Sequence, residues 1–319
     1  MKTKTSRFGE LLFLAAFLFS PLRAQDSNFL FSISEIERRL QYEAFEIFQV
    51  RDSRFSGDIT KRVTLKFPDS VFMQVKWKRA PKDGWGVNNE PRYEIAAYQL
   101  QKLFLEPPAY VVPPTLGRSL PLEAYRALDP EVAPTFKNTA CVFFVLQYWL
   151  QQVSQEGVYD QKRLSSDSTY ARHIGNMNIL SYLIDHKDSN IGNFLISTDP
   201  AHPRVFAVDN SMAFASLESN KGYEWRKLRV KHLPARTIER LRRITKEDLE
   251  KALGVVAQFE IKDGQLVPVA ASDCLDKNRG VRQKENIVQF GLTSYEINGV
   301  RDRLQKLLRD VDSGKLKTF

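Results

Sequence analysis

The chain has 319 residues, of which 43% are hydrophobic and 27% are charged, and its formal net charge is +9. This length and composition are typical of a globular protein with a sizeable core, and they exclude disordered, collagen-like and multi-span membrane proteins. The positive charge favours an anionic partner, such as an acidic protein or an anionic lipid, although lysines spread over a solvated surface give the same total. No nucleic-acid partner is expected.

The first 24 residues have the layout of a signal peptide. Basic residues up to Arg7 precede the apolar stretch Leu11 to Phe19, and a proline-containing turn ends at Ala24. The apolar stretch is shorter than the roughly 20 residues of a spanning helix, so cleavage near Ala24 is favoured over the alternatives, an uncleaved anchor or a core helix. Residues 1–24 carry four basic side chains and one acidic side chain, so their removal leaves a charge of +6. We therefore expect an exported protein (periplasmic, secreted or in a secretory lumen) with no transmembrane span after cleavage.

The chain has two cysteines, Cys141 and Cys274, and neither has a second cysteine or a histidine at metal-ligand spacing. A zinc site is therefore not expected. Export would permit a disulfide between them, but Cys141 lies in an apolar run, where a buried free thiol is the commoner outcome.

The first elements predicted after the signal peptide are a helix and a β-hairpin. Apolar residues recur at helical spacing between Ile33 and Val50, which predicts an amphipathic helix. The stretches 63–67 and 71–78 alternate apolar and polar residues on either side of a Pro-Asp-Ser turn, which predicts two antiparallel strands. Because side chains alternate along a strand, Lys76 and Lys78 share one face, about 6.6 Å apart.

A second helix and a long apolar strand follow. Apolar side chains between Tyr93 and Phe104 recur at helical spacing, and Glu94 lies on this helix. A proline-rich segment ends it. The apolar run 140–146 predicts a buried strand, and Gln147 and Tyr148 come directly after it, at a plausible crossing between two lobes.

The second half of the chain is predicted to be mainly helical around one polar loop. A buried stripe between Ile174 and Ile184 predicts a helix that leads into this loop. The stretches 194–196 and 205–208 are short apolar runs separated by a turn, so they predict two strands. Further helices are predicted around 235–253 and 297–308.

Three oxygen-bearing side chains stand at the ends of these elements. Asp188 lies on the loop, Asn193 comes five residues later at a strand entry, and Asp209 follows the next strand. Phosphoryl transfer needs a carboxylate that accepts the proton of the attacking hydroxyl, and a Mg²⁺ held by an amide oxygen and a second carboxylate. The spacing therefore predicts a phosphoryl-transfer site. Each residue alone is more typical of a turn, and a register shifted to Asp185 and Asn190 stays open.

Two segments carry a family resemblance. Asp188-Ser189-Asn190-Ile191-Gly192-Asn193 and Asp209-Asn210-Ser211-Met212-Ala213-Phe214 resemble the catalytic segments of type II phosphatidylinositol 4-kinases and of the secretory-pathway protein kinases of the Golgi casein kinase group. The stretches 94–100 and 111–115 are similar to the main helix and the following strand of the N-terminal lobe in these atypical kinases, so the resemblance covers residues 60 to 215.

The resemblance implies an α+β, bilobal protein-kinase-like fold. Its N-terminal lobe, residues 25–146, would hold a small antiparallel sheet and one main helix, and its C-terminal lobe, residues 147–319, would be mostly helical. The implied activity is transfer of the γ-phosphate of ATP to a hydroxyl of a protein, lipid or small-molecule acceptor. Asp188 would be the catalytic base, and Asn193 and Asp209 would hold Mg²⁺ or Mn²⁺.

The resemblance also implies a nucleotide site. Glu94 would orient a lysine that holds the phosphates of ATP, and this lysine is either Lys78 or Lys76, with Lys78 weakly favoured. The adenine would bind to backbone groups close to Gln147 and Tyr148.

Two departures from the kinase pattern matter. Only Ser56-Gly57-Asp58 resembles a glycine-rich phosphate loop, and it is a weak signal, although the atypical kinases also lack a full one. Asn210 stands where a phenylalanine usually follows the metal-binding aspartate, which removes a switch element but no metal ligand. A catalytically silent kinase-fold binding protein is therefore the alternative function.

The basic stretch from Arg226 to Arg243 lies where kinases receive their acceptor, and it predicts either an acidic substrate or a solvated helix face.

Overall fold

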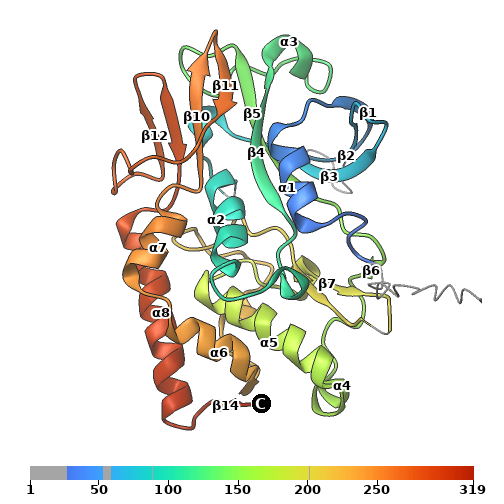
Figure 1. The fold of residues 1–319 in the computed structure, drawn as a ribbon, viewed down its shortest axis with the longest axis vertical. Coiled ribbons are helices and arrows are strands. Elements are labelled where there is room, and N and C mark those ends of the chain that lie inside the picture. Colours follow the sequence, from blue (N-terminus) through green and yellow to red (C-terminus); the bar gives the residue numbers. More distant parts are fainter. Residues whose placement is uncertain (1–26, 53–58, 88, 201) are drawn as a thin grey trace, which may run out of the picture.

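The computed structural model describes residues 27–52, 59–87, 89–200 and 202–319. The predicted signal peptide and the weak phosphate-loop signal at residues 56–58 lie outside the described residues. Figure 1 shows a lobe rich in strands above a lobe rich in helices.

The bounds of the elements are as follows. The helices are α1 (Ile33–Tyr42), α2 (Pro91–Gln101), α3 (Leu122–Tyr125), α4 (Gln161–Ser166), α5 (Ser168–Leu183), α6 (Ala235–Arg242), α7 (Lys246–Leu253) and α8 (Ser294–Asp312). The strands are β1 (Glu46–Asp52), β2 (Thr60–Lys66), β3 (Phe72–Arg79), β4 (Thr115–Pro121), β5 (Cys141–Tyr148), β6 (Val153–Ser154), β7 (Phe194–Ser197), β8 (Val205–Ala207), β9 (His232–Leu233), β10 (Ala257–Lys262), β11 (Gln265–Pro268), β12 (Val281–Lys284), β13 (Ile287–Phe290) and β14 (Lys317–Thr318).

Five antiparallel strands form the sheet of the N-terminal lobe, in the order β1-β2-β3-β5-β4. The predicted hairpin is confirmed as β2 and β3, and β5 pairs with the other side of β3. Val75 and Trp77 of β3 are fully buried in a core that also holds Ile36 of α1. Because strand side chains alternate, Lys76 and Lys78 lie on the opposite face from this core.

The first helix is shorter than predicted. Ser32 caps its start through a hydrogen bond from Glu35 N, and the helix ends at Tyr42. The chain then forms strand β1, where the sequence pattern predicted helix up to Val50, so that part of the prediction is wrong. The run 45–50 is rich in aromatic and β-branched residues, which favour a strand once an edge is available, and β2 supplies that edge.

Helix α2 is the main helix of the N-terminal lobe. It begins with Pro91 at its first position, where a missing N–H leaves no hydrogen bond unmade. Nearly all of its residues are buried, because it packs against β4, β5 and α7. A helix enclosed on all sides is fixed by its neighbours. This fixes the position of Glu94 in its first turn.

The C-terminal lobe is mostly helical, as predicted. Tyr170, Ile174 and Leu180 of α5 are fully buried in the largest core cluster, to which α6, α7 and α8 contribute. A small sheet of order β6-β7-β8 lies next to the loop that follows α5. Within the described part of the chain, no helix is long and apolar enough to cross a membrane.

A four-stranded antiparallel sheet, ordered β11-β10-β13-β12, was not indicated by the sequence. Figure 1 shows these strands in orange and red beside β4 and β5. Phe143 of β5 stacks on Phe290 of β13 with ring centroids 4.4 Å apart, and it meets Phe259 of β10 edge-on at 5.3 Å. A segment from the predicted C-terminal lobe therefore packs on the N-terminal sheet, and the lobe boundary after residue 146 stays a prediction. Cys141 is buried and, like Cys274, free, as the sequence favoured.

Candidate active site

The loop after α5 holds Asp188 in a fixed orientation. Asn193 Nδ2 donates to Asp188 Oδ2 at 2.7 Å and to its backbone oxygen at 2.7 Å. Asn190 Nδ2 donates to Asp188 Oδ1 at 3.0 Å. Asp185 instead pairs with Lys187 Nζ at 2.8 Å. The structure thus brings Asp188 and Asn193 together, in the register that the sequence favoured, and Asp185 is bound elsewhere.

Two short strands bring Asn193 close to the segment of Asp209. Phe194 of β7 lies opposite Ala207 of β8, and Val208 N donates to Asn193 O at 2.9 Å. Asn193 immediately precedes β7, and Asp209 comes two residues after β8. The pairing of the strands therefore places an amide and a carboxylate at the same end of one hairpin.

Asp209 has an unusual backbone conformation. Its φ is +59°, in the left-handed region that aspartate tolerates better than most residues. His186 Nε2 lies 3.2 Å from Asp209 O, and burial lowers the pKa of His186, which keeps the ring neutral. Residues held in such sparsely populated conformations concentrate at functional sites. The neutral imidazole thus helps to hold the bend that presents the Asp209 carboxylate.

Both candidate lysines reach this carboxylate. Lys76 Nζ lies 3.1 Å from Glu94 Oε1 and 3.2 Å from Asp209 Oδ1. Lys78 Nζ lies 2.9 Å from Ser211 Oγ, 3.4 Å from Asp209 Oδ1 and 3.7 Å from Glu94 Oε1. Lys76 makes the closer ion pairs with both carboxylates, whereas the sequence weakly favoured Lys78. Ser211 was not singled out from the sequence, although its position two residues after Asp209 is the signal that points to it.

The four charges of this cluster stabilise one another. Burial alone would lower the pKa of Lys76, but the Asp209 and Glu94 carboxylates raise it above its usual value. Lys76, followed by Lys78, holds the pKa of Asp209 well below its usual range. Lys76 and Asp209 are therefore both charged at neutral pH.

Glu94 joins three elements at this point. Its side chain is only 2% exposed, and its Oε2 accepts a hydrogen bond from Asn210 N at 3.0 Å while Oε1 faces Lys76. One carboxylate thus connects α2, β3 and the backbone directly after Asp209. Asn210 has a structural role here through its backbone, which the sequence pattern did not indicate.

The donor atoms of Asn193 and Asp209 suit a hard divalent cation. Asn193 uses its amide nitrogen on Asp188, which leaves the amide oxygen for a cation. The contacts from Lys76, Lys78 and Ser211 all fall on Oδ1 of Asp209 rather than Oδ2. Across the described residues, no three His, Cys, Asp or Glu side chains form a metal cluster. A cation here would need nucleotide phosphates as further ligands, which is how Mg²⁺ is commonly held.

The two residues predicted at the adenine site have different surroundings. Gln147 lies opposite Lys76 on β3, and its Nε2 donates to Thr115 Oγ1 at 3.0 Å. The Tyr148 side chain is turned the other way: its ring stacks on Phe29 at 5.4 Å, and its hydroxyl accepts from a backbone N–H. The Tyr148 N–H donates to Pro114 O, just before β4, at 2.9 Å. The structure thus brings Gln147 next to Lys76, whereas the Tyr148 side chain packs on Phe29, on the other face of β5.

A further cation lies in the same row as Lys76. Arg62 of β2 is directly opposite Lys76, its Nη2 donates to Gln74 Oε1 at 2.6 Å, and its guanidinium lies 4.5 Å from the ring centre of Trp149. Trp149 directly follows β5. The sheet face between the lysines and the crossing is therefore polar and cationic, which suits an anionic, planar ligand.

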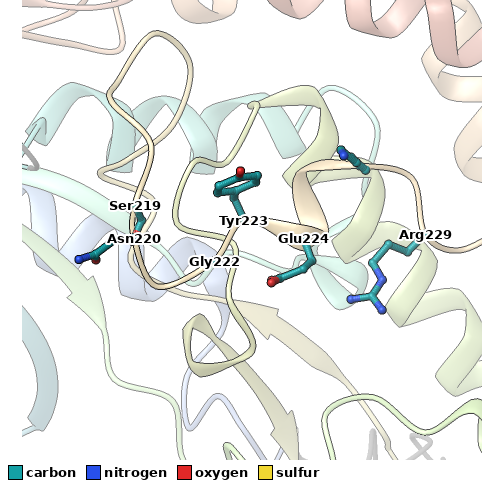
Figure 2. A pocket seen from close by; sticks show the side chains of 7 residues that line it. Ser219, Asn220, Gly222, Tyr223, Glu224 and Arg229 are labelled. Carbon is teal, nitrogen blue, oxygen red and sulfur yellow. The ribbon is translucent and has the colours of Figure 1, made fainter.

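An open pocket lies on the segment after Asp209 (Figure 2). It is lined by Ser219, Asn220, Gly222, Tyr223, Glu224, Lys227 and Arg229. Ser219 N donates to Lys187 O at 3.0 Å, which ties this segment to the loop of Asp188. In the view of Figure 2, Ser219 and Asn220 lie on one side and Arg229 on the other, with Tyr223 and Glu224 between. Two of its lining residues, Lys227 and Arg229, belong to the basic stretch that the sequence predicted on the acceptor side.

Solved structures share this fold. The chain is similar to a Fam20 protein from hydra, solved with a sugar, with a TM-score of 0.53 and 16% identity over 91% of this chain and 92% of that chain. It is also similar to a Golgi casein kinase, with a TM-score of 0.51 and 14% identity over 91% of this chain and 77% of that chain. No family model and no curated protein sequence matches. These likenesses confirm the α+β, bilobal kinase-like fold and its resemblance to the Golgi casein kinase group.

Proposed function

We propose that the protein is an ATP-dependent phosphotransferase that moves the γ-phosphate to a hydroxyl group. The observation that supports this most is the convergence of Lys76, Lys78, Glu94 and Asp209, from β3, α2 and the end of the β7–β8 hairpin, on one point. Two ammonium groups beside a carboxylate suit a polyphosphate and its cation. Lys76 alone would join these three elements, because it contacts both carboxylates, so the second lysine adds a positive charge that the fold does not need.

The residues divide the work as follows. Asp188, held by two asparagine amides, accepts the proton of the attacking hydroxyl. Lys76 and Lys78 bind the phosphates, and Glu94 holds Lys76 in place. Asn193 and Asp209 would hold Mg²⁺ or Mn²⁺, which supplies charge neutralisation to the phosphates when bound.

The acceptor is a hydroxyl of a protein, lipid or small molecule. The two similar structures bear different names, one a casein kinase and the other solved with a sugar, so the fold does not choose among these classes. In this chain the pocket of Figure 2 supports an acceptor with an anionic group, because Lys227 and Arg229 line it.

Thermal unfolding with nucleotide is the first test. ATP with Mg²⁺ or Mn²⁺, at about 100 times its dissociation constant, should stabilise the protein by about 2.7 kcal/mol. ATP without metal should stabilise it much less. If neither metal adds to the effect of ATP, the assignment of Asn193 and Asp209 as metal ligands is wrong.

Asp188→Asn tests catalysis, and Asp185→Asn is its matched control on the same loop. Loss of the general base should lower phosphate transfer to an acceptor by about 10²–10⁴-fold without affecting nucleotide binding. Asp185 pairs only with Lys187 in this loop, so its variant should keep most of the activity. Equal activity of the two variants would overturn the role of Asp188. A metal-dependent thermal shift without transfer by the unsubstituted protein would favour the catalytically silent alternative.

We also propose that the protein is exported by residues 1–24. The first described residues are already packed: Asn28 is fully buried, and its Nδ2 donates to Gln151 O at 3.0 Å. Cleavage after Ala24 would leave the packed segment intact. Sequencing the N-terminus of the protein recovered from a secreting host should give Gln25 as the first residue, and a start at Met1 would contradict the proposal.

A further inference from the structure

Arg92, in the first turn of α2, is bound through every nitrogen-bound hydrogen of its guanidinium group. Nη1 and Nη2 donate to the two carboxylate oxygens of Glu296 at 2.7 and 2.9 Å. Nε donates to Glu90 Oε2 at 3.0 Å, Nη1 also to Gly291 O at 3.2 Å, and Nη2 also to Tyr93 Oη at 2.9 Å. A guanidinium has five donors, and all five are used. The group is only 6% exposed, so this contact set is buried.

The partner of Arg92 is itself fixed. Glu296 lies in the first turn of α8 and forms a capping box with Thr293, whose N and Oγ1 donate to Glu296 Oε2 at 2.7 and 3.0 Å. The pair therefore joins the first turn of α2 to the first turn of α8. The backbone just before β12 closes over it, since a Cβ at Gly280 would lie only 2.3 Å from Arg92 Cζ.

The start of α2 has no side-chain cap. Its N-cap residue, Glu90, makes no capping hydrogen bond with its side chain. The carboxylate of Glu90 is used on Arg92 instead. At the first turn of α2, the contacts of Arg92 with residues about 200 positions later in the chain therefore add to the packing of the helix and take the place of a cap.

This first turn also carries Glu94. Glu94 binds Lys76 and the N–H of Asn210, so a shift of α2 would separate all three. Tyr93 adds a second link: its hydroxyl hydrogen-bonds Glu296, and its ring centre lies 5.1 Å from that of Phe214, just beyond Asp209. The contacts of Arg92 and those of the site thus meet on three consecutive residues of one helix.

We infer that Arg92 and Glu296 are positioning residues, a latch between α2 and α8 that keeps Glu94, Lys76 and the backbone after Asp209 assembled. The geometric part of the inference stands on the contacts alone, and its effect on activity rests on the proposed function. A permanently closed latch accounts for a site that is complete without a phenylalanine after Asp209. The C-terminal sheet and α8 supply this restraint from outside the lobe in which α2 lies.

Hydrogen exchange at Asn210 measures the latch without any activity. The Asn210 N–H is bound by Glu94 Oε2, so its exchange rate reports where α2 holds that carboxylate. Glu296→Gln keeps the side-chain shape and the capping box but loses the negative charge. Arg92→Lys keeps the positive charge but loses the planar guanidinium that donates to both carboxylate oxygens. In each variant the Asn210 amide should exchange about tenfold faster, the scale of one charge-assisted hydrogen bond.

Arg282→Lys is the matched control. Arg282 is another buried arginine of the C-terminal sheet, and it binds the carbonyls of Gly254, Asp276 and Leu292 rather than α2. Its variant should lower the melting temperature as the Arg92 variant does, but leave Asn210 exchange and kcat unchanged. Arg92→Lys and Glu296→Gln should also lower kcat about tenfold and raise the KM for ATP.

The outcomes separate the two proposals. If Asn210 exchange rises equally in the Arg92 and Arg282 variants, or in neither the Arg92 nor the Glu296 variant, the latch is wrong. If it rises only in the Arg92 and Glu296 variants while no form of the protein transfers phosphate, the latch stands and the proposed catalysis fails. If Arg92→Lys does not fold, Glu296→Gln alone decides, because it preserves the helix cap.

Discussion

Two clusters of charged side chains meet on helix α2, and they are built differently. Around Arg92, every donor of the guanidinium group has an acceptor, and the side chains of Arg92 and Glu296 are 7% and 3% exposed. Around Asp209, two lysines converge on one oxygen of a carboxylate that is 43% exposed. The first cluster is closed and satisfied, whereas the second presents uncommitted charge to solvent.

The difference distinguishes a positioning cluster, made of Glu90, Arg92, Tyr93 and Glu296, from a proposed binding cluster, made of Lys76, Lys78, Glu94 and Asp209. A buried ion pair is tolerable only when every polar atom finds a partner, which is the case for Arg92. In the binding cluster, lysines that together hold the pKa of Asp209 far below its usual range leave ammonium hydrogens and a carboxylate oxygen available for a ligand. A ligand of matching charge would find groups that are already ionised and oriented.

The contrast between the two clusters requires that the C-terminal sheet, which borders the Arg92 cluster, packs firmly on the N-terminal sheet. Phe143→Ala removes the ring that stacks on Phe290 and meets Phe259, and it should lower the free energy of unfolding by about 3–5 kcal/mol in urea denaturation. Phe72→Ala on the same N-terminal sheet is the control, because Phe72 is 45% exposed, and its loss should cost less than about 1 kcal/mol. Equal losses would mean that the C-terminal sheet is not packed as described.

The two lysines sharpen the comparison within the binding cluster. Lys76→Ala removes the closer ion pairs with both Glu94 and Asp209 and should lower kcat/KM for ATP about 100-fold. Lys78→Ala removes a bond to Ser211 and a longer contact with Asp209, so about a tenfold loss is expected. Steady-state kinetics over a range of ATP concentrations measures both. A larger loss in the Lys78 variant would reverse their roles.

Much of the binding cluster follows from local sequence signals. The spacing of Asp188, Asn193 and Asp209 is enough to predict that they lie close together, because a short strand or loop next to each residue fixes its place. Strand alternation puts both lysines on one face, but it does not rank them, since their distances to Glu94 depend on how α2 packs.

The positioning cluster could not be predicted in the same way. Arg92 and Glu296 are far apart in the sequence, and each alone looks like a charged residue in the first turn of a helix. Their pairing depends on the C-terminal sheet, whose short strands are interrupted by polar turns and give a weak periodic signal. The strand β1 was missed for a related reason, because its pairing partner, rather than its own pattern, decides between helix and strand.

The pH dependence of stability gives the smallest but most direct contrast between the clusters. Burial raises the pKa of Glu90 to about 7. The positive charge of Arg92 lowers this pKa and the negative charge of Glu296 raises it, but burial has the largest effect. The folded protein then keeps a proton that the unfolded chain loses near pH 4.5, so this contribution is complete below pH 4.5 and is lost as the pH rises through about 7. The pKa of Asp209 moves the other way, so its contribution is lost only in acid, below the usual aspartate range.

Between pH 5 and 7, therefore, Glu90 should make stability fall as the pH rises, whereas His173 and His186, whose pKa values burial lowers, make it rise up to about pH 6.5. The stability of the protein relative to that of Glu90→Gln, which cannot titrate at this position, should fall with a slope that approaches about 1.4 kcal/mol per pH unit for one full proton. Urea denaturation of both proteins at pH 5, 6 and 7 measures the two slopes. Parallel curves would show that Glu90 is ionised throughout, and that Arg92 carries two carboxylates at full charge. The positioning cluster would then be as charged as the binding cluster, and exposure alone would distinguish them.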